Sequence, residues 1–131
     1  MNNILIGILL IGFTTIVQAS NELQIWSCTT NEGKTGADVE AVSAAWLKAA
    51  RGMKGGDQLD VYLDVYLDVP IAASEGGDSF DFVLVAPSFE TWGVFTDGYE
   101  DSPAQKADED FLVVASCSSS SIWSSSKVEV E

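Results

Sequence analysis

Hydrophobic and polar residues alternate strictly between positions 59 and 69, where the four letters VYLD are repeated. Every second residue there is Leu or Val, and the residues between them are Asp or Tyr. This alternation predicts a half-buried strand, because successive side chains of a strand point to opposite faces. A helix would instead stack the aspartates on one surface as like charges. The polar side of the strand is a candidate interaction face, formed by Asp60, Tyr62, Asp64, Tyr66 and Asp68.

Two further strands and a long helix are indicated around this segment. Residues 22–30 alternate in part and residues 80–86 form a short apolar run, so both are predicted to be strands. The second is expected to form a hairpin with the strand at 59–69. Apolar side chains recur at three- and four-residue steps after a capping pair at residues 35 and 38, which predicts an amphipathic helix. The glycines at 55 and 56 are expected to end it.

The C-terminal part of the chain predicts two short helices and a last strand. Ser88 and Ser102 each precede a helical pattern and are predicted to be N-caps. The second helix is expected to end near residue 109, and residues 111–118 are predicted to form the final strand. The serine-rich segment 118–126 is expected to extend that strand irregularly or to fray. The first of the two helices carries an aromatic stripe of Phe89, Trp92, Phe95 and Tyr99.

The order of these elements predicts the fold class. Strand, helix, strand, strand, helix, strand is the βαββαβ order of a ferredoxin-like α+β protein, which has an antiparallel sheet with the helices on one face. The first and last strands are antiparallel neighbours in that topology, so Cys28 and Cys117 could face each other. These are the two cysteines of the chain, and we predict a disulfide between them rather than a metal site or a thiol nucleophile.

Residues 1–19 have the pattern of a cleaved secretory signal. An apolar run from Ile4 to about Val17 is followed by the small residue Ala19, where signal peptidase would cleave. The run is shorter than the roughly 20 residues that a bilayer span needs. Residues 20–131 then suit a single domain that ends in the serine-rich segment. We therefore expect an exported protein, periplasmic or secreted, with no membrane insertion after signal cleavage.

Charge and composition exclude several classes of function. Twenty acidic and six basic residues give a net charge of −14, which makes nucleic acid and anionic membranes poor partners. The acidity is either a solubilising surface or a face for cationic ligands or divalent ions. The chain has no histidine, so no Ser-His-Asp or Cys-His site can form.

Metal and cofactor sites are not expected. Aspartates four residues apart on the strand at 59–69 stand about 13 Å from one another, whereas the ligands of one calcium ion lie within about 2.6 Å of it. The acidic segments 97–101 and 108–110 lack the EF-hand spacing. There is also no phosphate-binding loop and no dinucleotide fingerprint.

Four short stretches carry a resemblance to a known superfamily: Trp26-Ser-Cys28, Gly33-Lys34-Thr35, Trp46 and Phe89-Glu-Thr-Trp92. Together with the element order they resemble the dimeric α/β-barrel superfamily, and most of all its uncharacterised secreted bacterial proteins. The resemblance implies a homodimer in which two sheets pack face to face, with any ligand cavity between sheet and helices. Relatives include cofactor-independent monooxygenases, haem-degrading enzymes and small isomerases. Because this chain lacks histidine, neither a histidine-ligated haem nor a histidine base carries over.

The aromatic residues allow two interpretations, on which the predicted function depends. Trp46, Trp92, Phe95 and Tyr99 either line a small apolar ligand pocket or simply fill the core. We favour a small, non-catalytic, disulfide-bonded binding or interaction protein, and no residue is assigned a catalytic role. The alternatives are a cofactor-independent monooxygenase or isomerase that acts on an apolar aromatic molecule, and a structural surface protein. A cavity with a polar group beside the aromatic rings would favour the enzyme.

Overall fold

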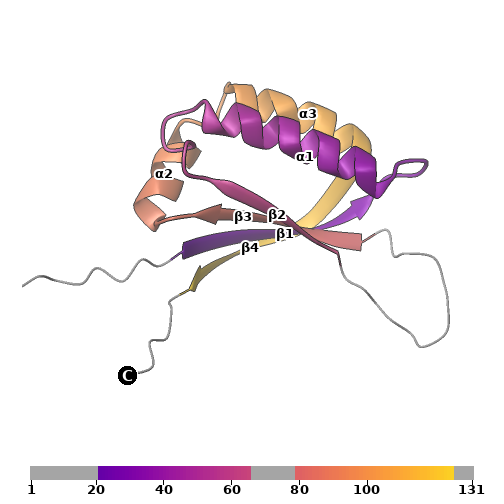
Figure 1. The fold of residues 1–131 in the computed structure, drawn as a ribbon, viewed down its shortest axis with the longest axis horizontal. Helices are drawn as coiled ribbons and strands as arrows, with labels where there is room; N and C mark the ends of the chain where they lie inside the picture. Colours follow the sequence, from indigo (N-terminus) through magenta and orange to yellow (C-terminus); the bar gives the residue numbers. More distant parts are fainter. Residues whose placement is uncertain (1–20, 66–78, 126–131) are drawn as a thin grey trace, which may run out of the picture.

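The computed structural model of the chain describes residues 21–65 and 79–125. Its three helices lie on one face of a four-stranded sheet (Figure 1). Both the α+β class and the ferredoxin-like arrangement predicted from the sequence are confirmed. The elements in chain order are β1 (Asn21–Thr30), α1 (Gly36–Arg51), β2 (Asp60–Val65), β3 (Ser79–Ala86), α2 (Phe89–Asp97), α3 (Pro103–Val114) and β4 (Ala115–Ser125).

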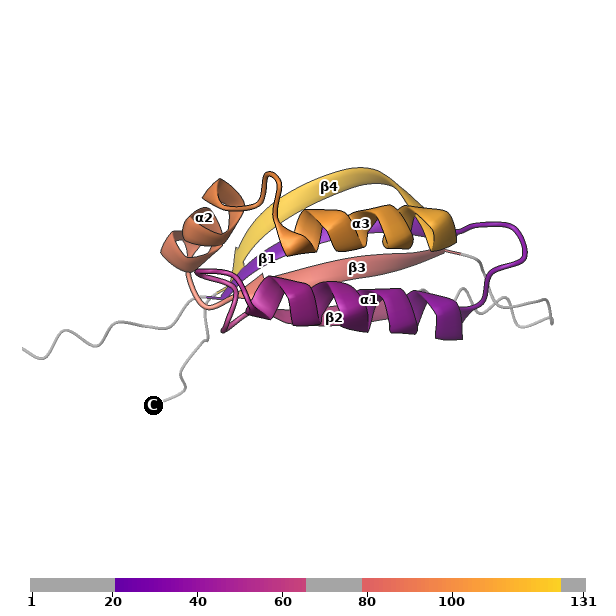
Figure 2. The same ribbon diagram turned by 90° about the horizontal axis from the view of Figure 1, so that it is seen from above.

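The strands of the sheet follow the order β2-β3-β1-β4, and each neighbouring pair is antiparallel. The first and last strands are therefore neighbours, as predicted. The register of this pair shifts between Ser27 and Cys28, after which Cys28 stands opposite Cys117. The two sulfur atoms form a disulfide, so the predicted bridge is confirmed. Seen from above, α1 and α3 lie side by side over the sheet, and α2 lies at one end of this helical layer (Figure 2).

The strand with the repeated letters has the two faces that its alternation predicts. Val61 and Leu63 of β2 pack against the core, whereas Tyr62 is 56% exposed. The side of β2 that points away from the helices holds the first two residues of the candidate interaction face, Asp60 and Tyr62, whereas the side chain of Asp64 is not among those that the structure describes. Tyr66 and Asp68, the last two residues of that face, lie outside the described residues, as does the proposed signal at 1–19.

The caps predicted from the sequence are present at the start of each helix. The hydroxyl of Thr35 accepts a hydrogen bond from the Asp38 amide, and the Thr35 amide donates to Asp38 Oδ2 at 2.8 Å. The hydroxyl of Thr35 also donates to Asp38 Oδ2, and this hydrogen bond together with that from the Thr35 amide holds the pKa of Asp38 below its usual value, because both favour the charged carboxylate. Ser88 and Ser102 accept in the same way from the amides three residues on.

Helix α1 ends earlier than the glycines at 55 and 56 predict. Its last residue is Arg51, and Gly52 is the C-cap. Arg51 Nε donates to the carbonyl oxygen of Leu59 at 2.9 Å, and its guanidinium forms an ion pair with Asp60. The end of the helix is thereby tied to the start of β2. The two glycines belong to the intervening loop, where Gly55 takes a left-handed φ of 78°.

The boundary between α3 and β4 also differs from the sequence-based prediction. Residues 111–114 were expected in the last strand, but α3 continues to Val114. The reason is burial: Phe111 and Val114 prolong the helix face that Ala104 begins and so reach the core. Packing outweighs the strand preference of the valines. The serine-rich segment extends the strand to Ser125 with an irregularity at its start, as predicted, because its backbone pairs with β1 on both sides of the register shift although its side chains are mostly exposed.

The core lies between the inner face of the sheet and the helices. Phe82 of β3 is at its centre, with edge-to-face contacts to Trp46 of α1 at 5.5 Å and to Phe111 of α3 at 5.4 Å between ring centroids. Within the described ranges, no helix is long and apolar enough to cross a membrane.

Candidate functional site

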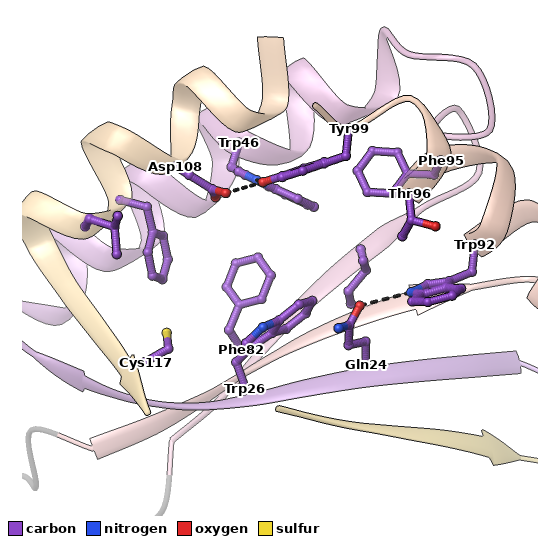
Figure 3. A pocket seen from close by; sticks show the side chains of 13 residues that line it. Gln24, Trp26, Trp46, Phe82, Trp92, Phe95, Thr96, Tyr99, Asp108 and Cys117 are labelled. Atoms are coloured by element: carbon purple, nitrogen blue, oxygen red, sulfur yellow. Dashed lines mark hydrogen bonds between the residues drawn. The ribbon is translucent and has the colours of Figure 1, made fainter. Parts of the chain in front are cut away.

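A cavity of about 420 Å³ lies between the sheet and the helices (Figure 3). Ligand pockets have volumes of roughly 300–1,000 Å³, so it is large enough for a small organic molecule. Seven of its thirteen lining residues are aromatic. The lining consists of Gln24, Trp26, Trp46, Phe82, Leu84, Trp92, Phe95, Thr96, Tyr99, Asp108, Phe111, Leu112 and Cys117.

The apolar walls of the cavity are held in place by ring contacts. On the sheet side, Trp26 of β1 meets Phe82 edge to face at 5.7 Å. On the helix side, Trp46 of α1 makes the same kind of contact with Phe95 of α2 at 5.9 Å. Because each ring is fixed by neighbours on other elements, the shape of the pocket is set by the fold before any ligand arrives.

A hydrogen-bonded group of three side chains forms a polar corner on the helix side. The indole Nε1 of Trp46 donates to the hydroxyl oxygen of Tyr99 at 3.2 Å, and that hydroxyl donates to Oδ2 of Asp108 (Figure 3). Tyr99 follows α2, and Asp108 comes from α3. We call Trp46, Tyr99 and Asp108 the acidic corner.

Burial changes the acidity of both ionisable groups in the acidic corner. It raises the pKa of Tyr99, and the hydrogen bond to Asp108 raises it further. Burial also raises the pKa of Asp108, while hydrogen bonds from Tyr99 and Trp46 oppose that rise. A carboxyl group with a raised pKa at a cavity wall can accept or return a proton, or it can pair with a cation.

A second polar side chain, that of Gln24, lies on the sheet side of the cavity. Gln24 of β1 accepts a hydrogen bond at Oε1 from the indole Nε1 of Trp92, at 3.0 Å (Figure 3). Its amide nitrogen carries two N–H donors, which can meet an acceptor on a ligand. The cavity therefore offers an acidic acceptor at Asp108 and a neutral donor at Gln24.

One side of the cavity is close to solvent. Leu112 of α3 lines the cavity and is nevertheless 61% exposed. Cys117 lines it as well, so the disulfide contributes to the wall between α3 and β4. A ligand could reach the aromatic walls from this side without unfolding a helix.

All four ligand-pocket candidates from the sequence line the cavity: Trp46, Trp92, Phe95 and Tyr99. The two interpretations of these residues are compatible, since Phe95 is only 2% exposed and belongs to the core as well. Phe89 is exposed and does not line the cavity, although its ring contacts Trp92. Whether the four residues bind a ligand stays a prediction.

The sequence did not single out Asp108 or Gln24. In the sequence pattern Asp108 stands out only as part of an acidic segment. Its position four residues after Ala104 and three before Phe111 is the signal that could have found it, because this spacing places it on the buried face of a helix. That signal was hidden because the helix was expected to end near residue 109.

The face of the sheet away from the helices, which we call the open sheet face, carries an apolar band of two rows, each across three strands; the first row ends at Ser121 on β4 and the second at Asp60 on β2. Cross-strand register aligns Tyr62, Val83 and Ile25 in one row. A second row aligns Val85, Leu23 and Trp123. Tyr62 and Trp123, at the two edges, are 56% and 59% exposed. Across residues 21–65 and 79–125, no group of three or more potential metal ligands gathers on this face or elsewhere.

Comparisons with known proteins identify the fold. No protein-family model matches the chain, and no curated protein matches it. SnoaB, a cofactor-independent oxygenase from Streptomyces nogalater, superposes with a TM-score of 0.52 at 8% identity, over 86% of this chain and 99% of its own. Hydroxynitrile lyase from Passiflora edulis gives 0.51 at 9% identity, over 87% and 98%. A dimeric ferredoxin-like protein of unknown function from Thermobifida fusca gives 0.49 at 14%, over 84% and 93%.

At these identities the likeness concerns the fold alone. The chain has a ferredoxin-like fold, as its sequence predicts.

Proposed function

We propose that the protein binds a small, largely apolar organic molecule in the cavity between its sheet and its helices. The observation that carries this proposal is the cavity of about 420 Å³ with seven aromatic lining residues. Ligand sites typically combine an apolar lining with a few polar groups that fix the orientation of the ligand. Asp108 and Gln24 supply such groups on different elements, α3 and β1.

Narrowing the exposed side of the cavity should weaken ligand binding. Leu112→Trp replaces an aliphatic side chain beside the cavity with a larger indole ring. The position is 61% exposed, so folding should tolerate the change. We expect the affinity for the neutral apolar probe N-phenyl-1-naphthylamine to fall at least about tenfold, which corresponds to about 1.4 kcal/mol. Fluorescence titration of the probe measures this.

Val113→Trp is the matched control for this change. Val113 is the next residue of α3 and is 62% exposed, but it does not line the cavity. Its variant should bind the probe as the unmodified chain does. Equal affinities for the Leu112→Trp and Val113→Trp variants would place the probe elsewhere and contradict the proposal.

A second candidate function is cofactor-independent catalysis, an oxygenation or an isomerisation of an apolar aromatic molecule. The specific observation in its favour is the carboxyl group of Asp108, which lines the cavity, has a raised pKa and accepts a hydrogen bond from the hydroxyl of Tyr99. Such a carboxylate can act as a general base. The test of catalysis is turnover of a bound molecule by the unmodified chain. The Asp108→Asn variant should still bind that molecule but no longer convert it.

Export and a homodimer are also part of the proposal. The signal-like residues 1–19 and the disulfide support passage into an oxidising compartment. The open sheet face supports a homodimer, because its apolar band of two rows is better covered by a second sheet than by water. The two sheets would pack about 10 Å apart.

Native mass spectrometry of the protein from its exported fraction should show a dimer of chains that begin at residue 20. Each chain should weigh two hydrogens less than the reduced form, and a retained ligand would add its own mass.

The double variant Tyr62→Asp, Trp123→Asp should be monomeric, because it places charge on both exposed edges of the band. A chain that keeps residues 1–19 would contradict export, and a monomeric unmodified chain would contradict the dimer.

A further inference from the structure

Among the described residues that line the cavity, the one charged side chain is negative. Among its described lining residues Asp108 is the single carboxylic acid, and there is no lysine or arginine. The chain as a whole carries a net charge of −14. A binding site of this kind attracts cations and repels anions, since a ligand with a carboxylate or phosphate would meet Asp108 without any positive partner.

The aromatic lining favours the same kind of ligand. The faces of tryptophan, tyrosine and phenylalanine rings attract a cation that lies within about 6 Å of the ring centre. Tyr99 donates to the carboxyl group and Trp46 donates to Tyr99, so both rings lie beside the carboxylate with their polar edges toward it. The carboxylate therefore fixes the position of a cationic group, and the aromatic lining as a whole favours a cation over an anion.

The hydrogen bonding of Asp108 leaves room for a ligand donor. Tyr99 donates to Oδ2, and an ionised carboxylate has about four acceptor sites on its two oxygens. A neutral apolar ligand would cover this carboxylate and remove it from water without replacing the lost hydrogen bonds, which is costly. An ammonium group replaces them with charge-assisted hydrogen bonds, which are the stronger kind.

We infer that the ligand is an organic amine in its protonated form, whose ammonium group binds Asp108 while its apolar body lies among the rings of Trp26, Trp46 and Phe82. The inference rests on the proposed function of the cavity as a ligand site. The carboxylate of Asp108 would thus select positively charged ligands over neutral and negatively charged ones.

Three probes with the same indole ring and different charge test this inference: tryptamine, which is a cation at neutral pH, tryptophol, which is neutral, and indole-3-acetate, which is an anion. Calorimetric titration of the disulfide-bonded full chain should show tryptamine binding at least about tenfold more tightly than tryptophol. Indole-3-acetate should bind most weakly. In Asp108→Asn the preference for tryptamine over tryptophol should disappear.

Two controls separate the charge effect from damage to the fold. Asp110→Asn removes the same charge from an exposed position of α3 outside the cavity, so it should keep the tenfold preference. Tryptophol binding by Asp108→Asn itself reports whether the cavity is intact. Equal affinity for tryptamine and tryptophol in the unmodified chain would overturn the amine inference and leave the ligand site standing. Absence of binding by all three probes would overturn both.

Discussion

Removing the disulfide by Cys28→Ala together with Cys117→Ser should lower the free energy of unfolding by about 4 kcal/mol. The bridge joins residues 89 positions apart, so it restricts most of the domain in the unfolded state. It also holds β4, whose side chains between Ser116 and Ser124 are exposed and contribute little packing. Backbone pairing with β1 would then be the main force that keeps the strand in place.

Urea unfolding followed by tryptophan fluorescence measures this loss. Alanine is used at position 28 because Cys28 is buried, whereas the exposed Cys117 tolerates a serine. Ser119→Ala, an exposed change on the same strand, is the control and should alter stability by less than about 0.5 kcal/mol. A loss below about 1 kcal/mol for the cysteine variant would mean that backbone pairing alone secures β4.

Local patterns were sufficient for the parts of the fold in which one physical effect decides the structure. The alternation of β2 is such a case, because its Asp and Tyr side chains cannot share the core with Val61 and Leu63. The three N-caps are another, since Thr35, Ser88 and Ser102 each satisfy an amide three residues on. The disulfide followed from topology once these elements were in order.

The end of α3 shows where local patterns fail. Residues 111–114 contain two valines and favour a strand by intrinsic preference, but the contact of the buried Phe111 with Phe82 of β3 keeps them helical. This contact joins residues far apart in the sequence, so no local window contains it. The same error concealed Asp108, whose place on the buried side of the helix depends on the helix continuing past residue 109.

Strand β1 shows a different limit. Its two sides are both largely apolar, with Leu23 and Ile25 on one and Trp26 and Cys28 on the other, so alternation does not indicate which side meets the helices. The structure places Trp26 and Cys28 on the core side, together with Gln24. Leu23 and Ile25 are thereby left on the open sheet face, where they join the apolar band on which the proposed dimer depends.

Gly56→Ala should be among the most destabilising single substitutions in the chain, at about 3 kcal/mol. A Cβ atom at this position would lie 1.8 Å from the backbone oxygen of Ala50 and 2.7 Å from its carbonyl carbon. Backbone atoms of a buried helix end cannot move aside as a flexible side chain can. The loop itself is held by hydrogen bonds from Gly56 N to Met53 O and from Leu59 N to Gly56 O, so it cannot yield without losing them.

The damage should extend to the cavity, because the preceding residue packs on α2. A Cβ at Gly55 would already lie 2.9 Å from the amide nitrogen of Phe95, so a displaced loop presses on the helix that carries Trp92 and Phe95.

Gly93→Ala is the matched control for Gly56→Ala. Gly93 lies in α2, and its added methyl group would meet nothing within 4 Å, so the substitution should stabilise the chain by about 0.5–1 kcal/mol. Thermal and urea unfolding of both variants measure the contrast. If Gly56→Ala unfolds at the same urea concentration as the unmodified chain, the loop does not pack against Ala50 as described, and α2 is positioned by other contacts.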